Sequence, residues 1–357
     1  MTSDIVFERK KQIGLITLNR PQALNALNLP MIKALQQQLL QWEGDESIHA
    51  VVIQAEVGKA FCAGGDVRWL YESGLAKNPE QMQFFWHEYR LNHYIHQFKK
   101  PYIALMNGIT MGGGVGISLH GSHPVATENF VFAMPETGIG FFPDIGASYL
   151  LARCPGQTGI YLGLTGDRLR ATDALALGLI KEVVDSRQLA EILKRLIDTD
   201  LSTNAHQTVT AILKEFAILA EKAAIEEERQ AIDACFAHLS VEKIMTNLQE
   251  KGDEWCQTTE QNLKQKAPLS LKVTLAQINK TKTLSMAECV AMDYCLVKHF
   301  MEDSDFYEGV RALLVDKDKS PRWQPENLAA VSEAKVADYF ESSSGLNFIL
   351  LPSDIDL

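Results

Sequence analysis

The chain has 357 residues, with 34 Lys and Arg against 45 Asp and Glu, and a formal net charge of −11. Hydrophobic residues make up 46% and charged residues 22%, a composition that is typical of globular proteins and excludes a disordered or fibrous chain. The acidic balance argues against a nucleic-acid partner, because a broad nucleic-acid footprint needs a basic surface. One or two local Lys or Arg could still serve a phosphorylated small ligand.

The cysteines and one long uncharged segment bear on the compartment. Six cysteines are scattered without a C-x-x-C pair, and the start of the chain lacks a secretory signal pattern, so we expect a cytoplasmic protein with free thiols. Residues 101–127 contain no Asp, Glu, Lys or Arg, as a membrane span would. Asn107 and several glycines interrupt this segment. We therefore expect buried soluble structure there and no membrane partner.

Predicted strands and helices alternate in the N-terminal half of the chain. The expected elements are a hairpin at 5–19 that breaks at Gly14, a helix at 29–42, a buried strand at 50–55, a helix at 79–99, and strands at 102–105 and 129–133. Such alternation predicts an α/β fold.

The composition changes after about Val184. Residues 188–265 are rich in Ala, Glu, Lys, Gln and Leu and predict successive helices, which continue to about Lys298. We expect two parts, namely residues 1–187 with the active site and residues 188–357 as a mainly helical C-terminal region.

Two small-residue loops each follow a predicted strand. The first contains Ala63, Gly64, Gly65 and Asp66, and the second contains the glycine run 112–114. Their backbone N–H groups could point at a negative oxygen, so together they suggest an oxyanion hole that stabilises charge on a carbonyl. For either loop alone, a tight turn that needs glycine explains the sequence as well.

Three carboxylates lie in apolar surroundings. Glu136 and Asp144 are the only charged residues between 129 and 152, and Glu88 falls within an apolar stripe of the predicted helix. Buried carboxylates have raised pKa values that suit acid–base chemistry near neutral pH. The alternatives are a turn or helix cap for Glu136 and Asp144, and an interior salt bridge for Glu88, which its pattern slightly favours.

Other chemistries have little support. No H-E-x-x-H or similar pattern predicts a metal site. Cys62 has no basic partner at a useful spacing and is read as a small buried filler.

The linked motifs resemble the crotonase (enoyl-CoA hydratase/isomerase) superfamily. The matching segments are Phe61-Cys62-Ala63-Gly64-Gly65-Asp66, Asn107-Gly108, Met111-Gly112-Gly113-Gly114 and Met134-Pro135-Glu136. Residues 88–92, 108–116, 134–144, 306–312 and 316–323 resemble its 3-hydroxyisobutyryl-CoA hydrolase branch. The resemblance spans nearly the whole chain and implies a spiral of strand–strand–helix turns with a helical C-terminal region.

The resemblance also implies site roles. The N–H groups of Gly65 and Gly113 would form the oxyanion hole, Glu136 and Asp144 would be catalytic, and Glu88 would contact the substrate. The loop from Ala63 to Asp66, including Gly64, would contact the CoA adenine, and Gly112 would also bind the substrate. The implied partner is a short 3-hydroxyacyl-CoA, hydrolysed within valine catabolism, with no cofactor apart from the CoA of the substrate. Because the superfamily often forms trimers, a homo-oligomer is allowed.

One departure from the hydratase pattern affects the expected reaction. Hydratases resemble one another in a second glutamate two residues after the glycine run, where this chain has Gly116. Hydrolysis is therefore expected. The alternatives are an enoyl-CoA hydratase or isomerase, and a non-catalytic scaffold that binds acyl-CoA or RNA.

Overall fold

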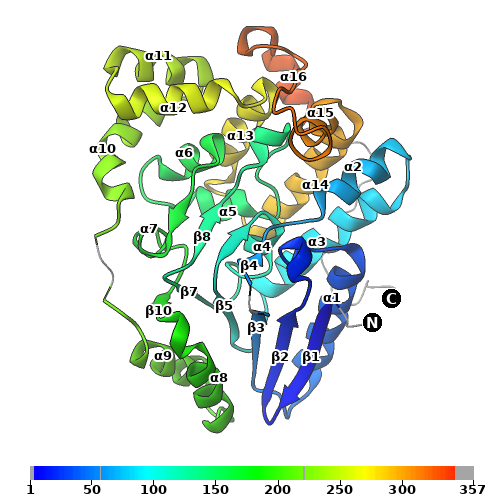
Figure 1. Cartoon of the computed structure of the whole chain (residues 1–357), viewed down its shortest axis with the longest axis vertical. Helices are drawn as coiled ribbons and strands as arrows, with labels where there is room; N and C mark the ends of the chain where they lie inside the picture. The colour runs from blue at the N-terminus through cyan, green and yellow to red at the C-terminus, as the bar shows by residue number, and fades with distance from the viewer. Residues whose placement is uncertain (1–3, 57, 220–221, 342–357) are drawn as a thin grey trace.

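Two β-sheets form the centre of the computed structural model, which describes residues 4–56, 58–219 and 222–341 (Figure 1). The larger sheet contains, in spatial order, β1 (Ile5–Lys10), β2 (Ile13–Leu18), β3 (Ala50–Ala55), β5 (Tyr102–Met106), β7 (His123–Thr127) and β10 (Glu182–Val184). The smaller sheet contains β4 (Ala60–Cys62), β6 (Ile109–Met111), β8 (Val131–Ala133) and β9 (Leu169–Arg170). The strands pair in parallel except at β1–β2 and β8–β9. The end of the predicted helical region, at 342–357, lies outside the described residues.

The chain passes repeatedly from the larger sheet to the smaller one and then into helices. The helices of this part are α1 (Leu29–Gly44), α2 (Val67–Leu75), α3 (Glu80–His96), α4 (Gly113–Gly116), α5 (Ala147–Leu151), α6 (Thr158–Thr165) and α7 (Ala171–Ala176). Short 3-10 turns are η1 (Pro21–Ala23), η2 (Glu136–Ile139) and η3 (Ser186–Gln188). The segments β3–β4–α2, β5–β6–α4 and β7–β8–η2 are three turns of one spiral, which confirms the expected α/β spiral of strand–strand–helix turns.

The N-terminal hairpin is confirmed, but its turn is not at Gly14. The chain reverses at Lys11 and Gln12, and Lys11 has a φ of 56°. Gly14 lies inside β2, where a Cβ would be 2.5 Å from Cε3 of Trp42. Gly14 is thus a packing glycine, which lets the indole of α1 lie directly on the sheet.

Helices cover both faces of the larger sheet, so its central strands are apolar on both sides. Ile16 and Leu18 of β2 belong to the main hydrophobic cluster, whereas Ile13 and Leu15 face a second cluster that includes Ile192 of α8 (Leu189–Asp198). This explains the continuous burial of β2, as expected for a strand covered on both faces. Residues 101–127 are likewise buried structure, and no helix among the described residues is long and apolar enough to cross a membrane.

The C-terminal region is helical, as predicted, and part of it returns to the spiral. Its helices after α8 are α9 (Ala205–Glu215), α10 (Ile225–Phe236), α11 (Val241–Lys251), α12 (Glu254–Lys264), α13 (Pro268–Thr281), α14 (Met286–Glu302), α15 (Asp305–Val310) and α16 (Glu333–Asp338), with a 3-10 turn η5 (Leu328–Ala330). Helix α13 packs on α5 and α6, and α14 packs on α3. The main hydrophobic cluster therefore draws on both predicted parts; the boundary at 187/188 stays a prediction.

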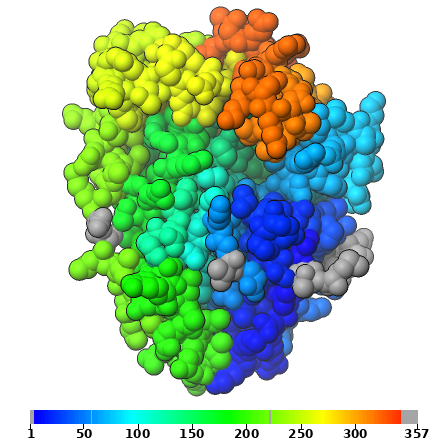
Figure 2. Space-filling model, in the orientation of Figure 1, coloured from blue at the N-terminus to red at the C-terminus, as the bar shows by residue number. Residues whose placement is uncertain are grey.

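A C-terminal strap, defined as residues 311–325, begins with the π-helical turn η4 (Arg311–Val315). Its orange surface forms a raised block beside α2 (light blue) in Figure 2, and α15, which precedes it, contacts α2. Leu313 and Leu314 of this turn line a cavity of about 230 Å³. The strap thus carries part of the cavity wall.

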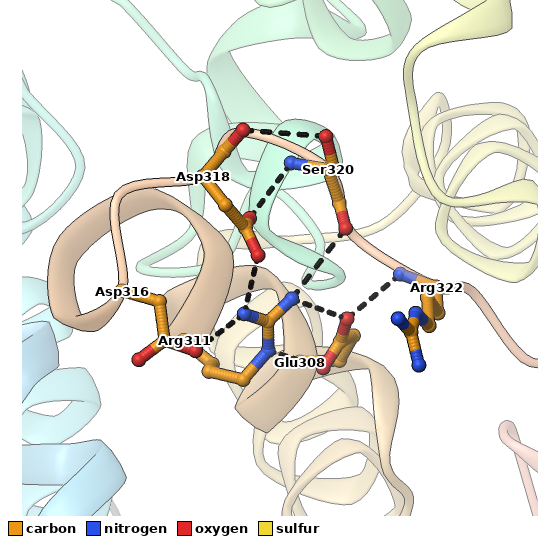
Figure 3. A network of polar contacts seen from close by, with 6 residues as sticks. All are labelled: Glu308, Arg311, Asp316, Asp318, Ser320 and Arg322. Carbon is orange, nitrogen blue, oxygen red and sulfur yellow. Dashed lines mark hydrogen bonds and ion pairs between the residues drawn. The ribbon is translucent and has the colours of Figure 1, made fainter.

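Arg311 is the hub that holds the strap (Figure 3). Its guanidinium pairs with Glu308 at 2.8 Å, Asp316 at 2.6 Å and Asp318 at 2.7 Å, and these partners raise the pKa of Arg311 further. Glu308 also accepts a hydrogen bond from the backbone N–H of Arg322 at 2.8 Å. Only a planar, multi-donor cation satisfies several carboxylates in this way.

We expect Arg311→Met to loosen the strap, because three carboxylates would then face one another without their shared cation. Limited proteolysis should cut within residues 311–325 several-fold faster than in the wild type. Arg68→Met is the matched control, since Arg68 pairs with Glu72 alone on the exposed surface of α2 and such pairs contribute little. Equal cutting rates in both variants would contradict the role of Arg311.

Candidate active site

The two glycine turns lie against each other. They follow β4 and β6, which are parallel neighbours in the smaller sheet, so both turns come at the same edge. A Cβ on Gly64 would lie 3.7 Å from the nitrogen of Gly113, and a Cβ on Gly113 would lie 3.3 Å from the nitrogen of Gly65. Gly64 and Gly112 also have positive φ values of 114° and 46°, which favour glycine. The glycines thus serve both conformation and close backbone approach.

Among the residues that the structure describes, the N–H groups of Gly65 and Gly113 donate no hydrogen bond to another backbone group. Leu27 forms a parallel bridge with Gly65, in which the N–H of Leu27 donates to Gly64 at 2.8 Å and the N–H of Asp66 donates to Leu27 at 2.9 Å. Gly113 is the first residue of α4, so its N–H has no acceptor within the helix. Two adjacent backbone donors are therefore available to a ligand oxygen.

Three carboxyl side chains from different elements share one cavity of about 230 Å³ with these turns. Glu88 comes from α3, Glu136 begins η2, and Asp144 lies in the turn before α5; they are 2%, 6% and 6% exposed. The apolar part of the wall consists of Val67, Leu70, Phe84, Phe85, Met111, Pro135, Ile139, Phe141, Phe306, Leu313 and Leu314, with Ala63 beside the glycines. The arrangement combines buried acids with an apolar compartment.

Burial and mutual repulsion control the protonation of the three acids. Burial, with the charges of Asp144 and Glu136, raises the pKa of Glu88 well above its ordinary value. Burial and Asp144 likewise raise the pKa of Glu136 well above its ordinary value. Burial raises the pKa of Asp144 to about 7, opposed by a hydrogen bond from Tyr89. Interacting acids of this kind share protons near neutral pH, so the site can both take and give a proton.

The structure decides between the alternatives for these carboxylates. Among the described residues, Glu88 forms no ion pair, and its Oε1 is buried without a hydrogen-bond partner, so the interior salt bridge was the wrong expectation. Neither η2 nor α5 has a side-chain cap, which argues against capping roles for Glu136 and Asp144. Oε2 of Glu136 is also buried without a partner. Unpaired buried oxygens are costly unless a ligand or water uses them.

Tyr89 was not among the predicted site residues. Its hydroxyl donates a 2.7 Å hydrogen bond to Oδ2 of Asp144. The sequence placed it next to Glu88 but gave no sign of this contact, because its partner is 55 residues away.

Asn92 occupies the space that a side chain at position 116 would need. A Cβ on Gly116 would lie 2.5 Å from Nδ2 of Asn92, which is fully buried. The carboxamide therefore fills the direction that a side chain at 116 would take.

The remaining predicted positions divide into two groups. Ala63, Gly64, Gly65, Gly112 and Gly113 line the cavity. The side chain of Asp66 instead caps α2, by accepting from the N–H of Trp69 at 3.1 Å, and pairs with Arg20 at 2.9 Å.

The structure also bears on the thiol and metal alternatives. Burial raises the pKa of the Cys62 thiol to about 12, which disfavours a nucleophilic thiolate. In the described part of the chain, no group of three or more His, Cys, Asp or Glu side chains is arranged to hold a metal ion.

Comparison with known proteins identifies the family of this chain. The model of the enoyl-CoA hydratase/isomerase family matches residues 13–340. The chain is 44% identical to a mitochondrial 3-hydroxyisobutyryl-CoA hydrolase of Danio rerio, over 95% of this chain and 90% of the relative. It is 42% identical to the protein of that name in Homo sapiens, over 97% of this chain and 91% of the relative.

Solved structures agree on the fold. A carnitinyl-CoA dehydratase from Mycobacterium thermoresistibile superposes with a TM-score of 0.90 at 34% identity, over 96% of this chain and 98% of the other. An enoyl-CoA hydratase from Rhodobacter sphaeroides superposes with a TM-score of 0.87 at 34% identity, over 95% of this chain and 97% of the other. With its spiral fold, paired glycine turns and buried acids, the chain belongs to the enoyl-CoA hydratase/isomerase family.

Proposed function

We propose that this protein hydrolyses short 3-hydroxyacyl-CoA thioesters, with 3-hydroxyisobutyryl-CoA as its main substrate and 3-hydroxyisobutyrate and CoA as products. One arrangement carries the proposal: two unused glycine N–H groups and three buried carboxyls meet in one cavity. The relatives that are 44% and 42% identical along nearly the whole chain support the same reaction.

In the proposed mechanism, the thioester carbonyl oxygen accepts hydrogen bonds from Gly65 and Gly113. These donors stabilise the negative charge that develops on that oxygen. Glu136 either removes a proton from the attacking water or attacks the carbonyl carbon to form a mixed anhydride, which water then opens. Cleavage of the C–S bond releases the CoA thiolate, which takes up a proton.

The other two acids would assist. Ionised Asp144, held by Tyr89, orients the water. The proton that this water gives up to Glu136 can then pass to the departing thiolate. Glu88 holds the 3-hydroxyl of the substrate. Its carboxyl lies close to Gly113, where a Cβ would be 2.4 Å from Oε1. A protonated Glu88 suits that place, because an ionised one would repel the developing oxyanion.

A second hollow beside the cavity supports a CoA ester on this acidic chain. It is lined by Lys264, Lys266 and Lys319, and it shares Leu313 with the cavity. We propose that these lysines attract the phosphates of CoA.

The water and anhydride routes predict different isotope patterns. In a single turnover in ¹⁸O-water, an anhydride opened at the Glu136 carboxyl leaves label in the protein at Glu136. Label in the product alone would exclude that form of the anhydride route.

A hydratase is the second candidate, favoured by the likeness to the solved dehydratase and hydratase structures. Asn92 in the space beside Gly116 argues against it, because the water would lack one of two clamping carboxylates. Incubation with crotonyl-CoA and with 3-hydroxyisobutyryl-CoA distinguishes the two, since only the hydrolase releases thiol. A non-catalytic scaffold would neither hydrate crotonyl-CoA nor release thiol from 3-hydroxyisobutyryl-CoA.

The finer assignments are proposals as well. We propose a place in valine catabolism, which follows from the substrate, and a cytoplasmic location. The six cysteines are free and buried, which supports a reducing compartment. The word mitochondrial in the names of the relatives describes those proteins.

Glu136→Gln should lower kcat for 3-hydroxyisobutyryl-CoA by about 10²–10⁴-fold, because the amide can neither accept the water proton nor attack. Thiol release measured at saturating substrate tests this. The melting temperature should not fall, since the variant removes a buried carboxyl without a cation. Unchanged thiol release would contradict the role of Glu136.

Activity should rise with pH through about 7 if Asp144 acts in its ionised form, since its pKa is about 7. Tyr89→Phe removes a hydrogen bond that lowers the pKa of Asp144, so the acid limb of the kcat profile should move to higher pH. Tyr94→Phe is the control on the same helix, because Tyr94 donates to Glu43 instead. Activity that falls through pH 7 would contradict the ionised role.

Asp144→Asn should stabilise the protein at alkaline pH. The folded pKa of about 7 exceeds the usual value of about 3.9, so wild-type stability falls as pH rises between these values and stays lowered above them. The gain in melting temperature should therefore be larger at pH 8 than at pH 5. The exposed Asp338→Asn should show no such difference; an equal gain at both pH values would refute the assignment.

A further inference from the structure

The turn that carries Asp144 has an unusual backbone. Ile145 has a φ of 56° and is fully buried, and Gly146 follows with a φ of 70°. A β-branched residue rarely adopts the left-handed region, and such strain persists only where the surrounding structure enforces it. The chain turns sharply here, so that Asp144 lines the cavity while Ile145 packs into the core.

Three hydrogen bonds from outside hold this turn. Nε2 of Gln277 donates to the carbonyl of Pro143 at 3.0 Å, and Oδ2 of Asp293 accepts from the N–H of Gly146 at 2.7 Å. Nε2 of His120 lies 2.8 Å from the carbonyl of Ile145. Gln277 and Asp293 are also joined to each other at 2.8 Å. The residues on either side of Asp144 are thus fixed from α13, α14 and the segment before β7.

The protonation of His120 fits this contact. Burial lowers the pKa of His120 to about 3, so the ring is neutral. The 2.8 Å contact with a carbonyl therefore assigns the proton to Nε2.

Asp293 is a buried acid that the proposed reaction does not use. It is 0% exposed, does not line the cavity and forms no ion pair within the described residues. Burial raises its pKa well above the ordinary value. A carboxyl in such a place is unfavourable unless it satisfies a specific donor, and here it satisfies the N–H of Gly146 and the amide of Gln277.

We propose that Asp293 and Gln277 are positioning residues, which hold residues 143–146 in the strained conformation that directs Asp144 at the substrate. This inference rests on the proposed function, in which Asp144 orients water. Neither residue touches the substrate; they act through the backbone of the turn.

The first test is Asp293→Leu, which keeps the size of the side chain and removes both acceptors. We expect kcat to fall about 10–100-fold with KM changed less than about threefold, because the chemistry loses its alignment while the cavity wall remains. Asp293→Asn, which retains one acceptor, should recover most of the loss. Ser148→Ala is the control: Ser148 is fully buried nearby, with Oγ unpartnered, and should leave kcat unchanged.

The pH profile separates positioning from general support. Asp144 is faced by Glu88 and Tyr89 of α3, Glu136 of η2 and Asp293 of α14. If the turn relaxes, Asp144 leaves its buried place, its pKa falls, and the acid limb of kcat moves to lower pH in Asp293→Leu. A folded Asp293→Leu variant with wild-type kcat and an unmoved limb would overturn the proposal.

A double-mutant cycle tests the strain itself. Glycine adopts positive φ without strain, so Asp293→Leu should cost less activity in an Ile145→Gly background than in the wild type. Additive losses would count against the clamp.

A crystal structure of Asp293→Leu gives a readout without activity. Relaxation of Ile145 to negative φ supports the clamp even if the wild type hydrolyses no hydroxyacyl-CoA, which would refute the proposed function alone. An unchanged turn would refute the clamp.

Discussion

The central constraint in this structure is the burial of Glu88, Glu136 and Asp144 in one cavity. Among the described residues, no Lys or Arg forms an ion pair with any of the three. Three such groups in one apolar cavity repel one another and lack solvation, so each must be held by its own element. Helix α3, the turn η2 and the turn before α5 do so from three directions, and Phe306 of α15 with Leu313 and Leu314 of the strap completes the wall. The glycine turns place backbone donors beside the acids without adding further charge. Burying the three carboxyls lowers the stability of the folded protein. In return, their raised pKa values let them exchange protons near neutral pH.

Sequence and structure agree where a residue was anomalous in its own neighbourhood. Glu136 and Asp144 stood out as isolated charges in an apolar stretch, and the glycine turns stood out by their position after strands. Gly14 was misread as a turn because a glycine that admits an indole looks the same in sequence as one that bends the chain. For Glu88, the apolar pattern alone slightly favoured a salt bridge, because such a pattern does not tell whether a cation is nearby; the substrate-contacting role stays a prediction. Tyr89, Asn92 and Asp293 could not be recognised, since each acts through a partner distant in sequence; Asp293 and Gly146 are 147 residues apart.

The same spiral fold therefore carries different reactions in this family. The solved dehydratase and hydratase share nearly all of the fold with this chain, and the paired glycine turns suit any reaction that develops charge on a thioester oxygen. In the proposed mechanism, the reaction depends on where the carboxylates lie around that oxygen. In this chain they come from α3, η2 and the turn before α5, whereas residue 116, two positions after the glycine run, is a glycine.

The contact between Asn92 and Gly116 also limits how such a protein can change. A longer side chain at 116 would overfill the interior beside Asn92. A shorter side chain at 92 would instead leave a cavity beside Gly116. A larger side chain at 116 therefore requires a compensating substitution at 92.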